Sequence, residues 1–95
     1  MSRNKLIIST NGGDQLKKFD YKGKKNISGE RIREARIKHH WTQADLAVKL
    51  QVAEVIIERD SISRIEKGTR LVTDYEIFVM AQLFNVSPLW LIGWE

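Results

Sequence analysis

The fold is decided by Thr42-Gln43-Ala44-Asp45-Leu46-Ala47-Val48-Lys49-Leu50 and, after a connector, by Ser61-Ile62-Ser63-Arg64-Ile65-Glu66-Lys67-Gly68. In the first part, Leu46 (or Ala44), Ala47 and Leu50 recur at the spacing of one helix face, and Thr42 can cap the N-terminus. In the second part, Ile62 and Ile65 stand three apart, and Gly68 supplies a C-terminal stop. The stretch therefore predicts two short helices, each with one buried face.

The second of these helices carries polar side chains on its outer face. We expect it to begin after Glu58 and to end at Lys67, with these outward residues: Arg59, Asp60, Ser61, Ser63 and Arg64. Two short helices arranged in this way make a helix-turn-helix, in which such side chains can reach base edges in the major groove. Arg can bond guanine as a fork, and an acid can accept from cytosine. Outside this motif, the same residues would indicate only a solvated charged face with weak salt bridges.

Four short motifs, in order and at consistent spacing, resemble the phage-repressor and Cro type of helix-turn-helix, often called Xre-like. They are Arg31-Ile32-Arg33, Thr42-Gln43-x-x-Leu46-Ala47, Ile62-Ser63-x-Ile65-Glu66-x-Gly68 and Val86-Ser87-Pro88-Leu89-Trp90-Leu91-Ile92-Gly93. The resemblance covers Ile27 to Gly93. It implies an all-α, five-helix domain that binds duplex DNA as a transcriptional regulator, more often as a repressor.

The resemblance also implies roles for single residues. Glu66 matches a family position that pairs with an Arg of the first helix, which here is Arg36, so we expect a structural ion pair. Thr69 and Arg70 occupy a turn that lies against the DNA backbone in similar proteins. The expected phosphate contacts are therefore Thr42 and Gln43 at a helix N-terminus, together with Lys67, Thr69 and Arg70.

The connector departs from the family pattern, because Ala53-Glu54-Val55-Ile56-Ile57 looks like an insertion between the two helices. Either the first helix of the motif, expected to end near Leu50 to Val52, runs on by a turn, or a loop bulges there. We expect a loop with at least one buried Ile, since three consecutive exposed apolar residues would form an interaction patch.

The remaining helices have recognisable ends. We expect the first helix over Ser28 to His39, with Ser28 as its cap and His40 in a left-handed conformation just beyond it. Thr73-x-x-Glu76 is a capping box that opens the next helix. Its buried stripe comprises Ile77, Met80, Ala81 and Phe84, and Asn85 is its left-handed stop. Ser87-Pro88 opens a last helix that ends at Gly93. Its apolar residues suggest a homodimer contact through Leu89, Trp90, Ile92 and Trp94.

Charge is concentrated at the N-terminus. Residues 1–26 hold seven Lys or Arg against two Asp, which gives +5, and the remaining residues hold nine basic against ten acidic groups, which gives −1. We call residues 1–26 the basic N-terminal arm and residues 27–95 the DNA-binding domain. The arm is either a flexible tail, a marginal hairpin around Leu6 to Phe19, or a segment that contacts phosphates through Lys17, Lys18, Lys22, Lys24 and Lys25.

Several function classes lack support in the sequence. There is no Cys, no Gly-rich phosphate loop and no persuasive catalytic constellation, so we expect no enzyme and no cofactor. His39 and His40 are adjacent and have no third ligand nearby, so we expect no metal site. No run is apolar enough for a membrane span, and we expect a cytoplasmic, nucleoid-associated protein. The alternative is a protein-interaction or antitoxin-like module built on the same fold.

Overall fold

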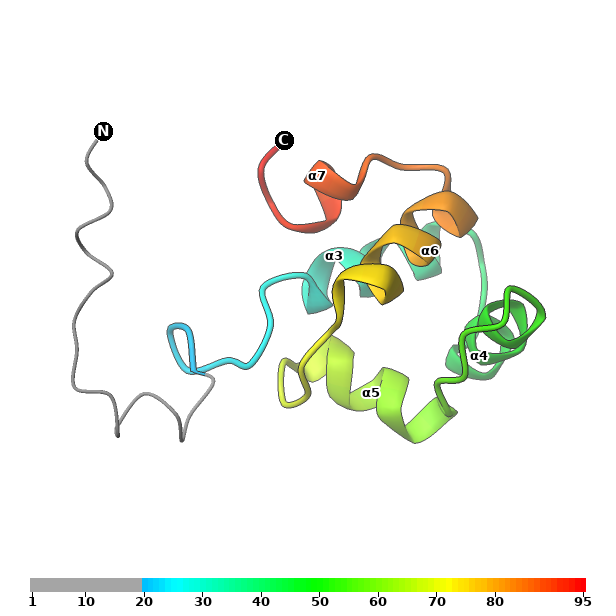
Figure 1. Cartoon of the computed structure of the whole chain (residues 1–95), viewed down its shortest axis with the longest axis horizontal. Coiled ribbons are helices and arrows are strands. Elements are labelled where there is room, and N and C mark those ends of the chain that lie inside the picture. The colour runs from blue at the N-terminus through cyan, green and yellow to red at the C-terminus, as the bar shows by residue number, and fades with distance from the viewer. Residues whose placement is uncertain (1–19) are drawn as a thin grey trace.

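Residues 20–95 are described by a computed structural model, and within this range the chain forms five α-helices (Figure 1). The helices are α3 (Gly29–Lys38), α4 (Gln43–Val52), α5 (Arg59–Lys67), α6 (Asp74–Phe84) and α7 (Pro88–Leu91). Within the same range the only β pairing is an isolated bridge between Tyr21 and Lys24. The prediction of an all-α, five-helix fold is thus confirmed, while the hairpin considered for Leu6 to Phe19 lies outside the described residues.

Reciprocal capping boxes begin α4 and α6; the box of α6 was predicted in full, and in α4 only the cap Thr42 was predicted. In α4, the Thr42 hydroxyl accepts from the Asp45 backbone N–H at 3.0 Å, and the Asp45 carboxylate accepts from the Thr42 N–H at 2.8 Å. Thr73 and Glu76 make the same exchange at the start of α6. Each box satisfies two backbone donors that a helix leaves unpaired at its N-terminus, and so fixes where the helix begins.

The first turn of α3 is capped differently from the prediction. The Ser28 side chain makes no capping hydrogen bond; instead, the Asn26 side-chain oxygen accepts from the backbone N–H groups of Ser28 at 3.1 Å and Gly29 at 2.8 Å. Ser28 holds the N-cap position, as predicted, but its side chain does not cap because its backbone is helical, with φ −103° and ψ −7°. A capping residue normally needs an extended backbone to bring its side chain over the free N–H groups.

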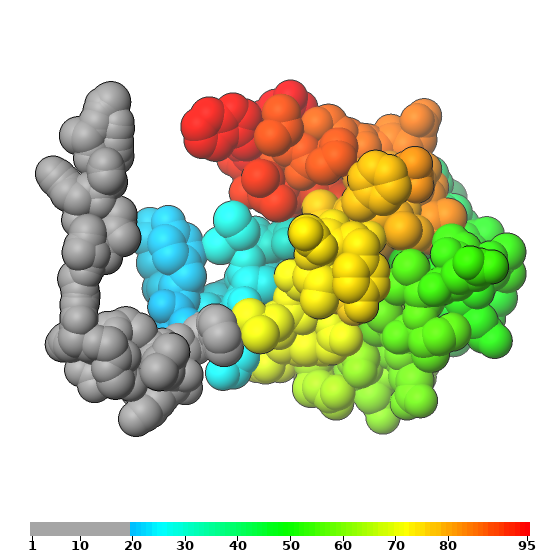
Figure 2. Space-filling view, viewed as in Figure 1, coloured from blue at the N-terminus to red at the C-terminus, as the bar shows by residue number. Residues whose placement is uncertain are grey.

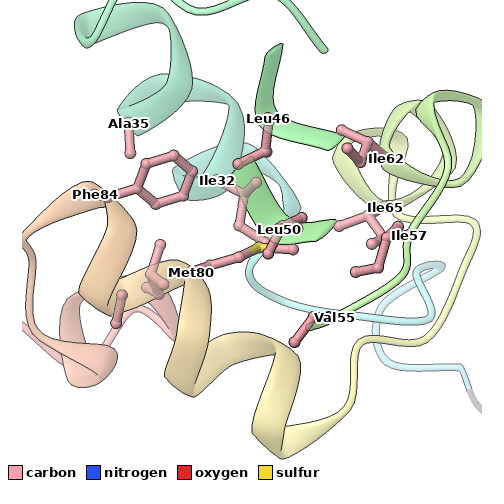
Figure 3. Close-up of a cluster of buried hydrophobic side chains, with 12 residues drawn as sticks. Ile32, Ala35, Leu46, Leu50, Val55, Ile57, Ile62, Ile65, Met80 and Phe84 are labelled. Carbon is pink, nitrogen blue, oxygen red and sulfur yellow. The ribbon is translucent and has the colours of Figure 1, made fainter. Parts of the chain in front are cut away.

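The core lies where α3, α4, α5 and α6 meet (Figure 3). Leu46 and Leu50 of α4 and Ile62 and Ile65 of α5 are fully buried, as the helical spacing predicts. Around them pack Ile32, Ala35, Met80, Ala81, Phe84 and Leu91. Trp41 is partly buried against this core and stacks on His39, with ring centroids 4.4 Å apart. Within residues 20–95, no helix has the length and apolar character needed to cross a membrane.

The lengthened turn before α5 is a loop whose apolar residues alternate between core and solvent. Val55 and Ile57 are buried and point into the core in Figure 3, whereas Ile56 is 70% exposed. The predicted loop with a buried Ile is therefore confirmed, and α4 does not continue through it. Two buried anchors on either side of one exposed residue fix the loop against the core, so α5 begins at a defined place despite the insertion.

A left-handed residue follows each of the five helices within residues 20–95, and those after α3, α5 and α6 were predicted. Gly68 after α5 has φ 83°, Asn85 after α6 has φ 60°, and His40 after α3 has φ 61°. Gly68 and Asn85 close their helices through backbone hydrogen bonds to the last turn. The chain thus turns sharply after α5 and places the following loop beside the C-terminal end of that helix, as Figure 1 shows.

Candidate nucleic-acid interface

The helix α5 is held to the rest of the domain by one face only. Ile62 and Ile65 are fully buried on that face, and Glu66 is nearly so. A helix of nine residues would be marginal on its own in water, so packing of this face has to supply most of its stability. The opposite face is thereby left free for another molecule.

The ion pair between Glu66 and Arg36 locks α5 to α3. The Arg36 Nε donates to Glu66 Oε2 at 2.6 Å and Nη2 donates to Oε1 at 2.9 Å, so the two groups meet as a fork. Their side chains are only 11% and 4% exposed. The hydrogen bond to Glu66 raises the pKa of the Arg36 guanidinium above its ordinary value. Arg36 also donates to the Trp41 carbonyl at 2.9 Å, so it fixes the connection between α3 and α4 as well.

The five expected base-reading residues all lie on α5, outside the hydrophobic core. Arg59 and Asp60 are exposed at the N-terminal end, with 3.9 Å between their charged groups, and Arg64 is exposed nearer the C-terminal end. Ser61 and Ser63 are half-buried at its edges. The Arg64 Nη2 donates to the Ser61 hydroxyl at 3.1 Å, which holds that guanidinium along the helix. The exposed surface therefore offers fork-shaped donors, hydroxyls and one acid.

The N-terminus of α4 lies against α5 and presents Thr42 and Gln43. The Thr42 hydroxyl oxygen is used in the capping box, while its side chain remains exposed. The Gln43 amide donates to Glu66 Oε1 at 3.1 Å, so this side chain links α4 to the ion pair instead of standing free. The sequence did not reveal this contact, because the two residues are 23 positions apart.

The other expected phosphate contacts, at the end of α5 and in the segment after it, differ in how free their side chains are. Lys67 is exposed. Thr69 is exposed too, and its hydroxyl lies 3.3 Å from the Arg64 carbonyl. Arg70 is engaged internally, because its guanidinium bonds the buried carboxylate of Glu76 at 3.2 and 3.4 Å. The structure thus adds a second ion pair, Arg70–Glu76, that the sequence analysis did not find.

Asn26 is a further residue that the sequence analysis did not single out. Besides capping α3, its side-chain amide donates to the carbonyls of Ile65 at 3.0 Å and Arg70 at 2.8 Å. These partners lie 39 and 44 residues away. Next to it, a Cβ on Gly29 would overlap the Ile65 carbonyl oxygen, so α3 and α5 approach as closely as only glycine permits.

Exposed apolar side chains gather on α6 and α7, away from the core. Of the C-terminal residues expected to be free, Leu89, Ile92 and Trp94 are exposed, whereas Trp90 is half-buried beneath the Arg31 guanidinium, 4.5 Å from the ring centre. The most exposed rings of α6 are those of Tyr75 and Phe78, at 58% and 57%, and neither was predicted as part of such a surface. In Figure 2 the first turns of α6 (yellow) face the viewer beside the α7 segment (orange to red).

Hollows connect these apolar residues into one surface. Tyr75 and Phe78 line a hollow with Pro88, and Leu89 and Ile92 line an adjoining hollow that shares Pro88 with it. We call these residues the α6–α7 surface: Tyr75, Phe78, Pro88, Leu89 and Ile92. Two valines of α4, Val48 and Val52, are equally exposed but are not among the residues that line these hollows.

No group of three or more potential ligands that could hold a metal ion occurs in the part of the chain that the structure describes. His39, considered above for metal binding, is stacked on Trp41, and its Nε2 lies 2.9 Å from the Phe84 carbonyl.

Comparison with protein families agrees with this geometry. The family model described as helix-turn-helix matches residues 32–91, which include all of α4 to α7 and most of α3. Neither the curated proteins nor the solved structures contain a match to the chain. The matched segment covers more than half of the sequence, and the chain therefore belongs to the helix-turn-helix family, a non-enzymatic family of DNA-binding transcription regulators.

Proposed function

We propose that this protein binds specific sequences of duplex DNA and represses transcription by occupying them, with α5 in the major groove. The observation that carries the proposal is that Arg59 and Arg64, about 1.4 turns apart, are both exposed on a helix fixed by buried contacts. Arg is the side chain that most often reads guanine in the major groove. Asp60 reads cytosine or tempers binding to other sequences, and Ser61 and Ser63 add hydroxyl contacts.

Phosphate contacts orient α5 in this proposal. Thr42 stands at the N-terminus of α4, where backbone N–H groups and the helix dipole favour an anion. Lys67 and Thr69 reach the strand at the other end of α5. Gln43 and Arg70 take part after exchanging an internal partner, Glu66 and Glu76 respectively, for a phosphate oxygen. Their contributions are therefore smaller than those of side chains that are already free.

A second copy of the chain completes the binding unit. Tyr75 and Phe78 leave roughly 200 Å² of apolar ring surface exposed, and Leu89 and Ile92 extend it. That area suits a weak dimer better than an obligate one, since stable interfaces bury ~800 Å² on each partner. Two half-sites about one helical turn apart would then hold the dimer together on DNA. Trp94, exposed at the C-terminus, adds to the same contact.

The experiment begins with selection of preferred duplexes from a random pool. Binding is then measured by fluorescence anisotropy for the wild type, Arg59→Ala, Arg64→Ala and the control Arg33→Ala, which removes a charge from the exposed side of α3. Each α5 variant should lose about 1–3 kcal/mol of preference for the selected sequence, and the control should lose none.

Salt dependence separates this proposal from the protein-interaction alternative, which the α6–α7 surface favours. Binding through several phosphates weakens steeply as salt rises, whereas an apolar protein contact does not. If the wild type binds no duplex at low salt and high protein concentration, DNA binding is refuted, and the α6–α7 surface becomes the place to look for a protein partner.

A further inference from the structure

The helix α5 and its preceding residue carry no net charge. From Glu58 to Lys67 there are three basic residues and three acidic residues, which cancel. Binding to DNA, however, depends on positive charge that replaces the counterions of the phosphates. The attraction to DNA therefore has to come from elements beside α5. In the described part of the chain, three lysines stand close together in sequence, namely Lys22, Lys24 and Lys25.

These three lysines lie in or beside a tight turn. Tyr21 and Lys24 exchange both backbone hydrogen bonds, at 2.6 and 3.0 Å, and the two residues between them have positive φ, 54° at Lys22 and 84° at Gly23. This is the two-residue hairpin turn in which both central residues are left-handed. A turn closed by two hydrogen bonds holds its lysines at a fixed separation; we call residues 21–25 the lysine turn.

The lysine turn is attached to the C-terminal end of α5. The Lys25 backbone N–H donates to the Gly68 carbonyl at 2.7 Å, and the aliphatic part of the Lys24 side chain lies directly against Gly68. The Lys22, Lys24 and Lys25 side chains are nevertheless exposed. The only ion pair that one of them makes within residues 20–95 is between Lys24 and the exposed Glu30, at 3.9 Å. Their charges are therefore available to another molecule.

Asn26 makes this attachment rigid. It immediately follows the turn, and its amide donates to the carbonyls of Ile65 and Arg70, on both sides of Gly68. Its oxygen accepts from the first N–H groups of α3. One side chain thus connects the base of the lysine turn with the end of α5, the following loop and the start of α3.

We propose that the lysine turn is a built DNA-contacting element, in which Asn26 positions Lys22, Lys24 and Lys25 over the phosphates next to the C-terminal end of α5. This inference rests on the proposed function, because it places the turn beside the strand that α5 approaches. Since the lysines keep a fixed offset from α5, they contact phosphates in register with the groove, unlike charges on a free tail. Asn26 acts through them and is a positioning residue.

The test measures how DNA affinity of the full chain varies with salt. Removing a phosphate contact makes the logarithmic slope shallower by about 0.9, so Lys22→Gln plus Lys25→Gln should lower it by about 1.8. The control pair is Arg33→Gln plus Lys38→Gln, which removes the same charge from the exposed side of α3. A control slope equal to that of the wild type is expected; equal slope changes in the two pairs would overturn the proposal.

Asn26→Ser tests the positioning role. Serine can still cap α3, but its side chain is too short to reach the Ile65 and Arg70 carbonyls. The variant should give a shallower salt slope at a temperature where circular dichroism reports full folding, and it should change nothing further when combined with the lysine pair. An unchanged slope would overturn the role of Asn26. If the wild type binds no DNA at all, the proposed function fails; if it binds and only these variants behave like the wild type, the inference alone fails.

Discussion

The substitution Glu66→Gln should be among the most damaging single changes in this domain, although it keeps the size and shape of the side chain. It removes the charge from a fork of two hydrogen bonds, at 2.6 and 2.9 Å, and leaves Arg36, whose side chain is only 11% exposed, without its counterion. Breaking one partner of such a pair costs about 3–5 kcal/mol. At a urea slope of about 1–1.5 kcal/mol per M, the unfolding midpoint should fall by roughly 2–5 M.

Two further variants make this result decisive. Asp60→Asn also removes an acid from α5, but the partner of this acid, Arg59, is exposed and 3.9 Å away. This substitution should therefore change the free energy of unfolding by less than about 0.5 kcal/mol. The double variant Arg36→Met plus Glu66→Leu removes both charges and should be more stable than Glu66→Gln, because no charge is left buried alone. Urea unfolding followed by circular dichroism measures all three. The buried-charge explanation would be refuted if Glu66→Gln lost less than about 1 kcal/mol of unfolding free energy, or if the double variant were less stable than Glu66→Gln.

Three other outcomes follow from features of the domain. Gly29→Ala should lower the free energy of unfolding by about 1–3 kcal/mol, because its methyl group would overlap the Ile65 carbonyl; a higher melting temperature would contradict this close approach. The backbone N–H that donates to the Asp45 carboxylate lowers its pKa below the usual 3.8, so its ionised form contributes stability above that pH and the contribution is lost as the pH falls through the lowered value. Asp45→Asn should therefore show a smaller loss of melting temperature between pH 6 and pH 2 than the wild type, and equal losses would count against this cap. Tyr75→Ser plus Phe78→Ser should shift sedimentation equilibrium towards the monomer, whereas serines at the exposed valines of α4 should not; equal behaviour would exclude the α6–α7 surface as the dimer contact.

Patterns within a few neighbouring residues were enough to predict where the helices lie. The cap Thr42 and the pair of Thr73 with Glu76 act within one helical turn, so residue type and spacing were enough to predict them, whereas the return bond to the Asp45 carboxylate was not predicted. The buried positions of α4 and α5 follow from helical periodicity in the same way. Even the inserted turn was predictable in outline, because an apolar run has to bury some of its members.

Contacts between distant segments were predictable only where a family position marked them. The Arg36–Glu66 pair came from the resemblance, while Arg70–Glu76 and the bonds of Asn26 had no such marker. Ser28 was the more obvious cap by residue type and position. The side chain of Asn26, held by its bonds to distant carbonyls, bonds the first N–H groups of α3 instead. Phe78 could not be assigned to solvent because α6 is apolar around most of its circumference, so periodicity does not distinguish its exposed side.

The place of Asn26 has a practical consequence for shortening the chain. A cut before Ile27 would look harmless from helix boundaries, since α3 begins only at Gly29. Such a cut would remove the cap of α3 together with the hydrogen bonds to the carbonyls of Ile65 in α5 and Arg70 in the following loop, and a lost cap alone typically costs ~1 kcal/mol. A fragment that begins at Asp20 keeps the turn and the asparagine. A minimal fragment meant for crystallisation or for grafting α5 onto another protein should therefore keep Tyr21 to Asn26.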